Sequence, residues 1–331
     1  MIAANAAASI PQILEAFWRG SLGTSSAFFS GTLVRAIPLT TVGVGIAIAF
    51  RSGVFNIGGE GQLLVGGVAA AFVGLHWAHA FAGATVVVAL IASMIAGGLW
   101  AGIAAVLRAR FGVLEVISTI MLNFIAMNLV SYLVRGPLQE PTRIYPQTES
   151  IAPSARLPII LADTRLHAGI VIAVAVSVVA WTFLKHTAAG FRVRLVGASP
   201  TAALVTGRVN VSRETALALV ASGALAGLAG GVEVTGVTYA LYENLSPGYG
   251  FSAIAVAILA GLNPLGVLGT ALVFATLETG ALGMQRDAGV PSVVALVLEA
   301  IAILVAIAMS GGLTRFASRL QRAKMASRAA A

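Results

Sequence analysis

The sequence lacks cysteine altogether and has few charged residues. Without cysteine there can be no disulfide, no thiolate chemistry and no cysteine-based metal site. Charged residues make up 10% of the 331 positions, against about 25% in an ordinary soluble domain. With 58% hydrophobic residues, a water-soluble fold could not cover its surface, which excludes a soluble enzyme, a DNA-binding domain and a disordered chain. The composition predicts a polytopic helical membrane protein of the all-α class.

Motifs of catalysis and cofactor binding are also missing. The four histidines form no HExxH motif and no cluster with carboxylates, so no metal site is expected. No GxxxxGK[ST] sequence is present, so the chain does not bind ATP through a P-loop of its own. No nucleophile with a neighbouring base is recognisable. We therefore expect neither an enzyme nor a cofactor. The net charge of +8 indicates a bias of cytoplasmic loops rather than a nucleic-acid partner.

Long apolar segments predict about nine membrane-spanning helices, since a span needs about 20 mostly apolar residues. Residues 1–26 lack the pattern of a signal peptide and are predicted to form an amphipathic segment at the membrane interface. The membrane domain is expected over 27–310, followed by a basic tail at 311–331. The predicted spans are 27–50, 54–78, 83–107, 113–134, 166–184, 214–240, 250–262, 265–284 and 290–310.

Lysine and arginine predict the orientation of these spans. The segment 185–213 and the tail from 311 are basic and contain no acidic residue, whereas 135–165 has a net charge of only +1 (4 − 3). Cytoplasmic loops carry the excess of basic residues, so both basic segments and the C-terminus are expected in the cytoplasm. Nine spans then place residues 1–26 outside.

The layout also predicts two inverted halves. Each half has a full span followed by a glycine-interrupted segment, 53–62 in the first and 244–264 in the second. Broken helices at matching places in inverted halves mark substrate sites in many transporters.

Gly223, Gly227 and Gly231 form a stripe that predicts close helix packing, and Gly98 and Gly102 are interpreted in the same way.

The sequence FRSGVFNIGGEGQ at 50–62 contains three polar side chains, Asn56, Glu60 and Gln62. Glycines let the backbone leave the helix, and ionisable groups at membrane depth are costly unless paired or facing water. One interpretation is that the three residues line a translocation pathway. The other is a structural cap, in which Glu60 accepts backbone hydrogen bonds. The sequence leaves both open.

The fourth predicted span carries a polar stripe. Glu115, Thr119 and Asn123 recur every four residues and share one helix face, which faces either a pathway or another helix. Thr119 and Asn123 are therefore pathway candidates, with Asn123 the better one because it lies mid-span. Glu115 lies near the helix start and could instead complement the N-terminus of the helix.

The basic segment 190–216 is too polar to span a membrane. Pro200 opens a short helical stretch that ends at Gly207, in accordance with the preference for proline at helix starts and glycine after helix ends. Such a helix on a basic loop suits docking to a soluble partner. A loop that merely anchors topology would explain the charges but not the helix.

Three stretches resemble permease subunits of bacterial ABC importers of the branched-chain amino acid, ribose and nucleoside group, most of all the guanosine and nucleoside branch. They are AFRSGVFNIGGEGQLLVGG (49–67), EVISTIMLNFIA (115–126) and GFRVRLVGASPTAA (190–203). The resemblance covers about 27–312 and implies the type II importer fold with ten helices per subunit. The chain departs from that pattern because the first family helix is missing, so either it has nine spans or its start codon is placed late.

The resemblance implies the partners. They are an ABC ATPase subunit, a second permease subunit, an extracytoplasmic binding protein, a nucleoside-like solute and the bilayer of a bacterial cell membrane. It also implies that 190–213 carries the coupling helix that contacts the ATPase, with these candidate residues: Arg192, Arg194, Gly197, Pro200, Thr201, Ala202, Ala203 and Gly207. Simple sugars are the main alternative cargo. An ion-coupled secondary transporter is a further alternative, against which the 190–213 segment argues.

Overall fold

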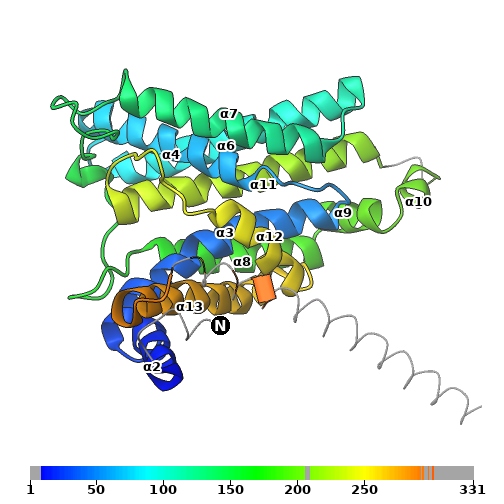
Figure 1. Cartoon of the computed structure of the whole chain (residues 1–331). Helices are drawn as coiled ribbons and strands as arrows, with labels where there is room; N and C mark the ends of the chain where they lie inside the picture. Colours follow the sequence, from blue (N-terminus) through cyan, green and yellow to red (C-terminus); the bar gives the residue numbers. More distant parts are fainter. Residues whose placement is uncertain (1–8, 206–208, 292, 294–296, 298–299, 302–331) are drawn as a thin grey trace, which may run out of the picture. The chain divides into compact units, whose positions relative to one another are not determined.

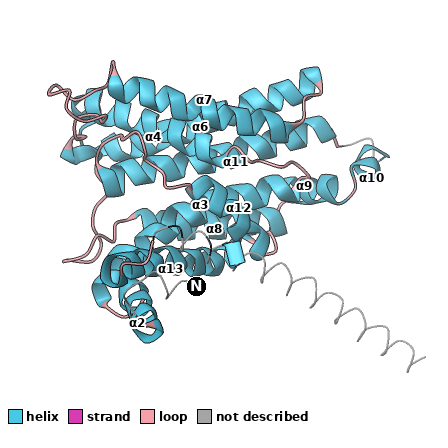
Figure 2. Ribbon diagram, viewed as in Figure 1, coloured by secondary structure: helices cyan, strands magenta, loops and turns pink. Residues whose placement is uncertain are grey.

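The computed structural model describes residues 9–205, 209–291, 293, 297 and 300–301. Two compact units are present: Leu22–Thr276, and a second unit formed by Met1–Ser21 with Leu277–Ala331. Figures 1 and 2 show that the described part is helical, and it contains two isolated β-bridges but no strand. The predicted all-α class is confirmed.

Within the part of the chain that the structure describes, six helices are long and apolar enough to cross a membrane by length and composition. The first, Ala27–Arg51, joins a π-helical turn, η1 (Ala27–Thr32), to α3 (Leu33–Arg51). The other five are α6 (Thr85–Phe111), α7 (Glu115–Arg135), α8 (Gly169–His186), α11 (Val211–Glu233) with the π-helical η4 (Val234–Thr238), and α13 (Pro264–Ala288).

The two glycine-interrupted segments form shorter helices. The second predicted span, 54–78, becomes α4 (Gly59–His76), because residues 54–58 are not helical. The seventh becomes α12 (Tyr249–Leu259), whose 11 residues span roughly 16 Å at the α-helical rise, about half of a hydrocarbon core. Most of the ninth predicted span, 290–310, lies outside the described residues, and so does all of the basic tail 311–331. The remaining helices are short: α2 (Ile10–Ser21), α5 (Ala78–Phe81), η2 (Ala82–Ala84), η3 (Pro153–Ala155), α9 (Ala188–Ala198) and α10 (Pro200–Val205).

Glycines bring α4, α6 and α11 into direct backbone contact in the larger unit. A Cβ atom at Gly227 would lie against the carbonyl oxygen of Ser93 and 2.9 Å from the Cα of Gly97, both on α6. A Cβ at Gly66 of α4 would meet the backbone of Gly227 itself. Small residues permit this approach where larger ones would separate the helices. The close packing predicted for the α11 stripe is confirmed.

On α6 the residue at the crossing differs from the prediction. Gly97 makes the close contact, whereas a Cβ at Gly98 or Gly102 would find its nearest neighbour at 3.5 and 3.9 Å, which is ordinary packing distance. Helical periodicity explains the difference, because Ser93, Gly97 and Ala101 share the face that meets α11.

The long connection between α7 and α8 is bonded to the end of α11. The amide of Leu157 donates to the carbonyl of Thr235 (2.8 Å), and the amide of Ile151 donates to that of Tyr239 (2.8 Å). These bonds satisfy backbone groups that would otherwise be buried without partners. The connection is therefore attached to η4, which continues α11, and to the residue that follows η4.

Two titratable groups in the segments between helices have pKa values that their surroundings lower. Hydrogen bonds from Arg135 and Ser131 hold the pKa of the Glu243 carboxyl below its usual range, and Arg135 NH2 lies 2.7 Å from Oε2. The pKa of His167 is lowered to about 4. Burial is the larger cause, and the nearby charge of Arg165 is the smaller one. His167 is therefore neutral, and its Nδ1 accepts a hydrogen bond from the amide of Gly169 (3.1 Å).

The N-terminal helix α2 is amphipathic, as predicted. Ile13 packs with Ala281 and Met284 in the smaller unit. Leu14 and Trp18 remain 63% and 57% exposed. An exposed apolar stripe with a tryptophan suits a membrane interface, which remains a prediction for this segment.

We predict that Gly227→Ala destabilises the protein by about 1–3 kcal/mol, because the added methyl group forces α11 away from α6 and α4. Thermal unfolding of the purified protein in detergent measures the effect. Gly102→Ala is the matched control, since its methyl group meets only the Val220 side chain at 3.9 Å. Equal melting temperatures for the two variants would contradict the role of the crossing.

Candidate functional site

The chain breaks its helical path between α3 and α4. Gly53 has a φ of +80°, a conformation that glycine adopts without strain. The hydroxyl of Ser52 donates to the carbonyl of Ala49 (2.7 Å), and the amide of Gly58 donates to the Oδ1 of Asn56 (2.9 Å). The first bond lies at the C-terminal end of α3, and the second involves Gly58, the residue directly before α4. The predicted interruption is thus an ordered turn.

Asn56 and Gln62 form a reciprocal pair of amides inside the bundle. Asn56 Nδ2 donates to Gln62 Oε1 at 2.8 Å, and Gln62 Nε2 donates to Asn56 Oδ1 at 3.0 Å. Asn56 Nδ2 also donates to the hydroxyl of Ser222 on α11 (2.8 Å). Both amide side chains are buried, so the pair satisfies polar groups that would be costly if left unbonded.

Asn123 of α7 completes this cluster from the opposite side. Its Oδ1 accepts a hydrogen bond from the amide of Gly61, and its Nδ2 donates to the carbonyl of Ile57, both at 2.9 Å. A side-chain amide therefore replaces the partners that the backbone loses at the break. Thr119, one turn earlier, packs its Cβ 3.0 Å from the position of a Cβ at Gly58, while its hydroxyl donates to the carbonyl of Glu115 (2.7 Å).

Glu60 connects α4 to the second broken segment. Its Oε2 accepts a hydrogen bond from the amide of Gly250 at 2.7 Å, in the first turn of α12. A carboxylate at a helix N-terminus is stabilised by free amide groups and by the helix dipole. Glu60 is buried, so this geometry supports the capping interpretation.

The structure thus brings four of the five candidate pathway residues into one cluster, and Glu60 extends it to α12. All five are buried, and each makes a hydrogen bond within the protein: Asn56, Glu60, Gln62, Thr119 and Asn123. None of them lines the cavities of about 290 and 760 Å³ at the basic end of the bundle. The cluster is closed in this conformation.

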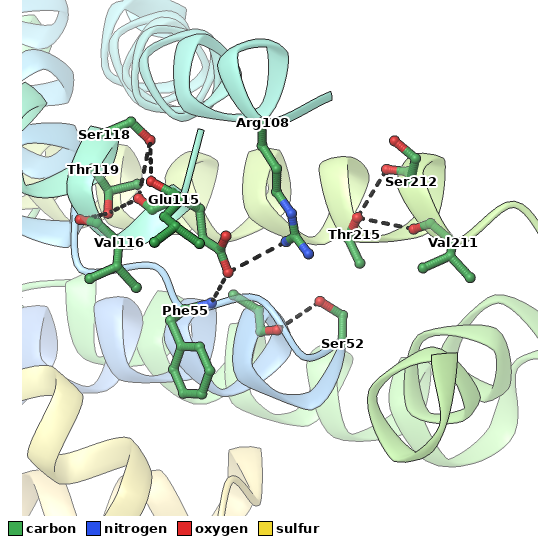
Figure 3. A network of polar contacts seen from close by, with 12 residues as sticks. Ser52, Phe55, Arg108, Glu115, Val116, Ser118, Thr119, Val211, Ser212 and Thr215 are labelled. Carbon is green, nitrogen blue, oxygen red and sulfur yellow. Dashed lines mark hydrogen bonds and ion pairs between the residues drawn. The ribbon is translucent and has the colours of Figure 1, made fainter. Parts of the chain in front are cut away.

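Glu115 links the break to the turn between α6 and α7 (Figure 3). Its Oε1 accepts a hydrogen bond from the amide of Phe55 (3.4 Å) and lies 3.5 Å from NH1 of Arg108. The hydroxyl of Ser118 bonds to a carbonyl of its own helix. The start of α7 is therefore fastened to the same turn that carries Asn56.

The basic segment after α8 forms two helices, of which sequence reasoning expected one. Helix α9 begins after Thr187, whose hydroxyl accepts a hydrogen bond from the amide of Gly190 (3.0 Å). Arg192 of α9 pairs with Glu214 of α11 at 2.7 Å. Because this ion pair joins residues 22 apart in sequence, periodicity alone could not reveal it.

Gly197 brings α9 against the end of α3. A Cβ atom there would collide with the carbonyl oxygen of Arg51 and lie 3.1 Å from the amide nitrogen of Gly53. Arg51 in turn donates from Nε to the carbonyl of Leu262 (2.9 Å) and from NH2 to that of Gly261 (3.3 Å). One small contact thus joins α9 to the break and to the turn after α12.

Helix α10 runs from Pro200 to Val205, which confirms the predicted helix start, while Gly207 lies outside the described residues. The hydroxyl of Ser199 accepts from the amide of Ala202 (3.2 Å) and caps the helix. Leu204 and Val205 are 61% and 83% exposed. Pro200, Thr201 and Ala202 are also exposed, whereas Ala203 is buried.

Sequence reasoning missed three residues that hold these elements together: Ser222, Arg51 and Gly250. The position of Arg51 directly before the glycine-rich stretch was the one available signal. For the others, the partner lies far away in sequence. Among the described residues, no group of three or more histidine, aspartate or glutamate side chains could hold a metal ion.

Comparisons with known proteins identify the family. The model of the "Branched-chain amino acid transport system / permease component" family matches residues 28–310. The guanosine ABC transporter permease protein NupP of Bacillus subtilis is 39% identical over 304 residues, covering 89% of this chain and 85% of the relative.

Two further relatives agree. The glucose ABC transporter permease protein TsgB13 of Haloferax volcanii is 36% identical, covering 85% of this chain and 76% of the relative. The nucleoside ABC transporter permease protein NupB of Lactococcus lactis is 32% identical, covering 83% and 78%. No solved structure is significantly similar. The chain therefore belongs to the branched-chain amino acid transport permease family and is a multi-pass permease of the ABC transporter type in the cell membrane.

Proposed function

We propose that this chain is the membrane-spanning subunit of an ATP-driven importer and that its cargo is a nucleoside. The 39% identity to a guanosine permease over 89% of the chain carries the cargo assignment, and the nucleoside permease of Lactococcus supports it. Members of the family are permease subunits and not enzymes. ATP hydrolysis therefore belongs to a separate ATPase subunit.

The segment α9–α10 is proposed to bind that ATPase and to transmit its conformational change to the membrane helices. Helix α10 offers the exposed apolar side chains of Leu204 and Val205 to a partner, while α9 is the base that holds it. The residues proposed for coupling lie in these two helices, with the addition of Gly207, which is outside the described residues: Arg192, Arg194, Gly197, Pro200, Thr201, Ala202, Ala203 and Gly207. In this proposal Arg192 and Gly197 transmit motion through their contacts with Glu214 and Arg51.

The proposed orientation follows the basic residues. The end of the bundle with Arg108, Lys185 and Arg192 faces the cytoplasm, together with the tail 311–331, because cytoplasmic loops carry the excess of basic residues. The 135–165 connection then faces outward, toward an extracytoplasmic binding protein. A second permease subunit completes the pathway.

The buried amide cluster is proposed as the polar part of the pathway. In the closed conformation, the groups of Asn56, Gln62 and Asn123 bond to one another or to the backbone. Alternating access requires a second arrangement in which part of this bonding is exchanged for the solute. Amides provide both donors and acceptors, which suits a nucleobase and a ribose. Glu60 and Thr119 hold the neighbouring backbone.

A sugar is the second candidate cargo. The specific observation is the 36% identity to a glucose permease. Amide and carboxylate groups bind sugar hydroxyls as well as nucleobases, so the cluster itself does not discriminate. An ion-coupled secondary transporter is the weaker alternative, because it needs no docking helix such as α10.

We predict that Asn123→Ala lowers the free energy of unfolding by about 1–3 kcal/mol, because it leaves the buried amide of Gly61 and carbonyl of Ile57 without partners. Uptake should fall with it. Thermal unfolding in detergent and solute uptake by cells are the two measurements.

Asn128→Ala is the matched control for this prediction. Asn128 lies on the same helix, is exposed, and bonds only to the carbonyl of Phe124 within its own helix. It should retain stability and uptake. If the two alanine variants behave alike, the cluster has no special role.

We predict that cells producing the transporter take up radiolabelled guanosine in an ATP-dependent way. Depletion of ATP should abolish uptake, while an ionophore at constant ATP should leave it intact. Excess unlabelled guanosine should compete and excess glucose should not. Competition by glucose alone would assign the sugar cargo, and uptake that collapses with the ionophore but survives ATP depletion would refute the ATP-driven mechanism.

A pair of variants tests the docking helix in the same assay. Leu204→Glu places a charge on the exposed face of α10 and should reduce uptake at least about tenfold, since 1.4 kcal/mol of lost docking energy corresponds to that factor. Leu114→Glu changes a leucine of similar exposure in the α6–α7 turn and should retain uptake. Normal uptake by Leu204→Glu would count against α10 as the docking helix.

A further inference from the structure

A cavity of about 290 Å³ lies at the basic end of the larger unit, where α3, α8, α9 and the turn before α13 meet. The polar residues that line it are Arg51, Lys185, Arg194 and Asn263, and Trp181 forms an aromatic wall. Three of these side chains are cations, and none of the described residues that line the cavity is acidic. The cavity is separate from the buried amide cluster.

Two of the three cations are held in place by contacts within the protein. Arg51 is fixed by its bonds to the carbonyls of Leu262 and Gly261. The ammonium group of Lys185 lies 4.7 Å from the centre of the Trp181 ring. Arg194 is the unusual member, because its Nε is buried and has no hydrogen-bond partner among the described residues. A buried charged donor without a partner is costly, so the geometry calls for an anionic acceptor.

The residues around the cavity place it at the edge of the membrane. Trp181 and Lys185 belong to the last turns of α8, a spanning helix that exposes Val178 and Val179. Tryptophan rings favour the headgroup level, and lysine side chains reach out of the hydrocarbon to it. The cavity therefore lies at the depth of lipid phosphates, on the end of the bundle where basic residues are concentrated.

We propose that this cavity binds the phosphate group of an anionic phospholipid. The ligand chemistry is a phosphodiester anion held by Arg194, Lys185 and Arg51, with Asn263 as a neutral polar neighbour. Basic pockets between spanning helices on the cytoplasmic side are suited to such headgroups. Because Arg51 also contacts Gly197 of α9, a bound lipid fixes the base of the α9–α10 segment.

The test uses the full chain, purified with its co-expressed partners in detergent and stripped of lipid. Phosphatidylglycerol, phosphatidylcholine and inorganic phosphate are added separately. Native mass spectrometry measures retained lipid, and thermal unfolding measures stabilisation. We expect phosphatidylglycerol to be retained and to raise the melting temperature, while phosphatidylcholine and inorganic phosphate at the same concentration do not.

Single variants locate the site. Arg194→Gln and Lys185→Gln should each weaken phosphatidylglycerol binding about fivefold, the factor for one basic residue near an anionic surface (~1 kcal/mol). Lys185 is exposed, so its replacement leaves the fold intact. The matched control is Arg110→Gln, which removes an exposed arginine of the same end and should bind lipid as the unchanged protein does.

Four results would overturn the proposal. An equal shift with inorganic phosphate would make this a site for a free anion. An equal shift with phosphatidylcholine would remove the requirement for an anionic lipid. An equal loss in Arg110→Gln would indicate unspecific attraction by charge. Unchanged lipid binding in both cavity variants, with reduced recovery of the ATPase, would assign the cavity to the protein interface instead. None of these results depends on the identity of the imported solute.

Discussion

The contact between Gly197 and the end of α3 is the constraint on which the structure depends most. A methyl group at residue 197 would collide with the carbonyl of Arg51, so only glycine lets α9 lie against the turn at residues 51–53. That turn leads within three residues to Asn56 and the buried amide cluster. In the proposed coupling, a displacement of α9 reaches the buried amide cluster through the short irregular segment at residues 52–58. Packed interiors transmit such displacements because they are dense and hard to compress.

The polar side chains of the bundle are placed so that the breaks in the helices cost little free energy. The break before α4 leaves backbone groups without helical partners, and Asn123 and Asn56 replace them. Glu60 does the same for the start of α12. In a membrane each unpaired group would cost several kcal/mol, so the two breaks are tolerated only together with these side chains. Irregular backbone that side chains stabilise can also change its bonding partners, which is what alternating access requires.

The sequence predicts the helical class, the interruptions at residues 53–62 and 244–264, and the glycine stripe of α11, because each of these follows from composition or local periodicity. It does not predict α9, whose position depends on the ion pair between Arg192 and Glu214 and on a contact with Arg51. It also cannot choose between a pathway and a cap for Glu60, since the deciding partner, Gly250, lies 190 residues away. Local patterns reveal which residues are unusual, and distant contacts decide what they do.

The most direct test of this account is the uptake supported by Gly197→Ala per ATP hydrolysed. The added methyl group separates α9 from Arg51 while the exposed face of α10 stays unchanged, so we expect normal recovery of the ATPase and ATP hydrolysis with a strongly reduced yield of transported solute. Gly269→Ala, where a Cβ atom meets nothing within 4 Å, should transport normally. Full coupling in Gly197→Ala would contradict the claim that this contact carries motion from the ATPase to the pathway.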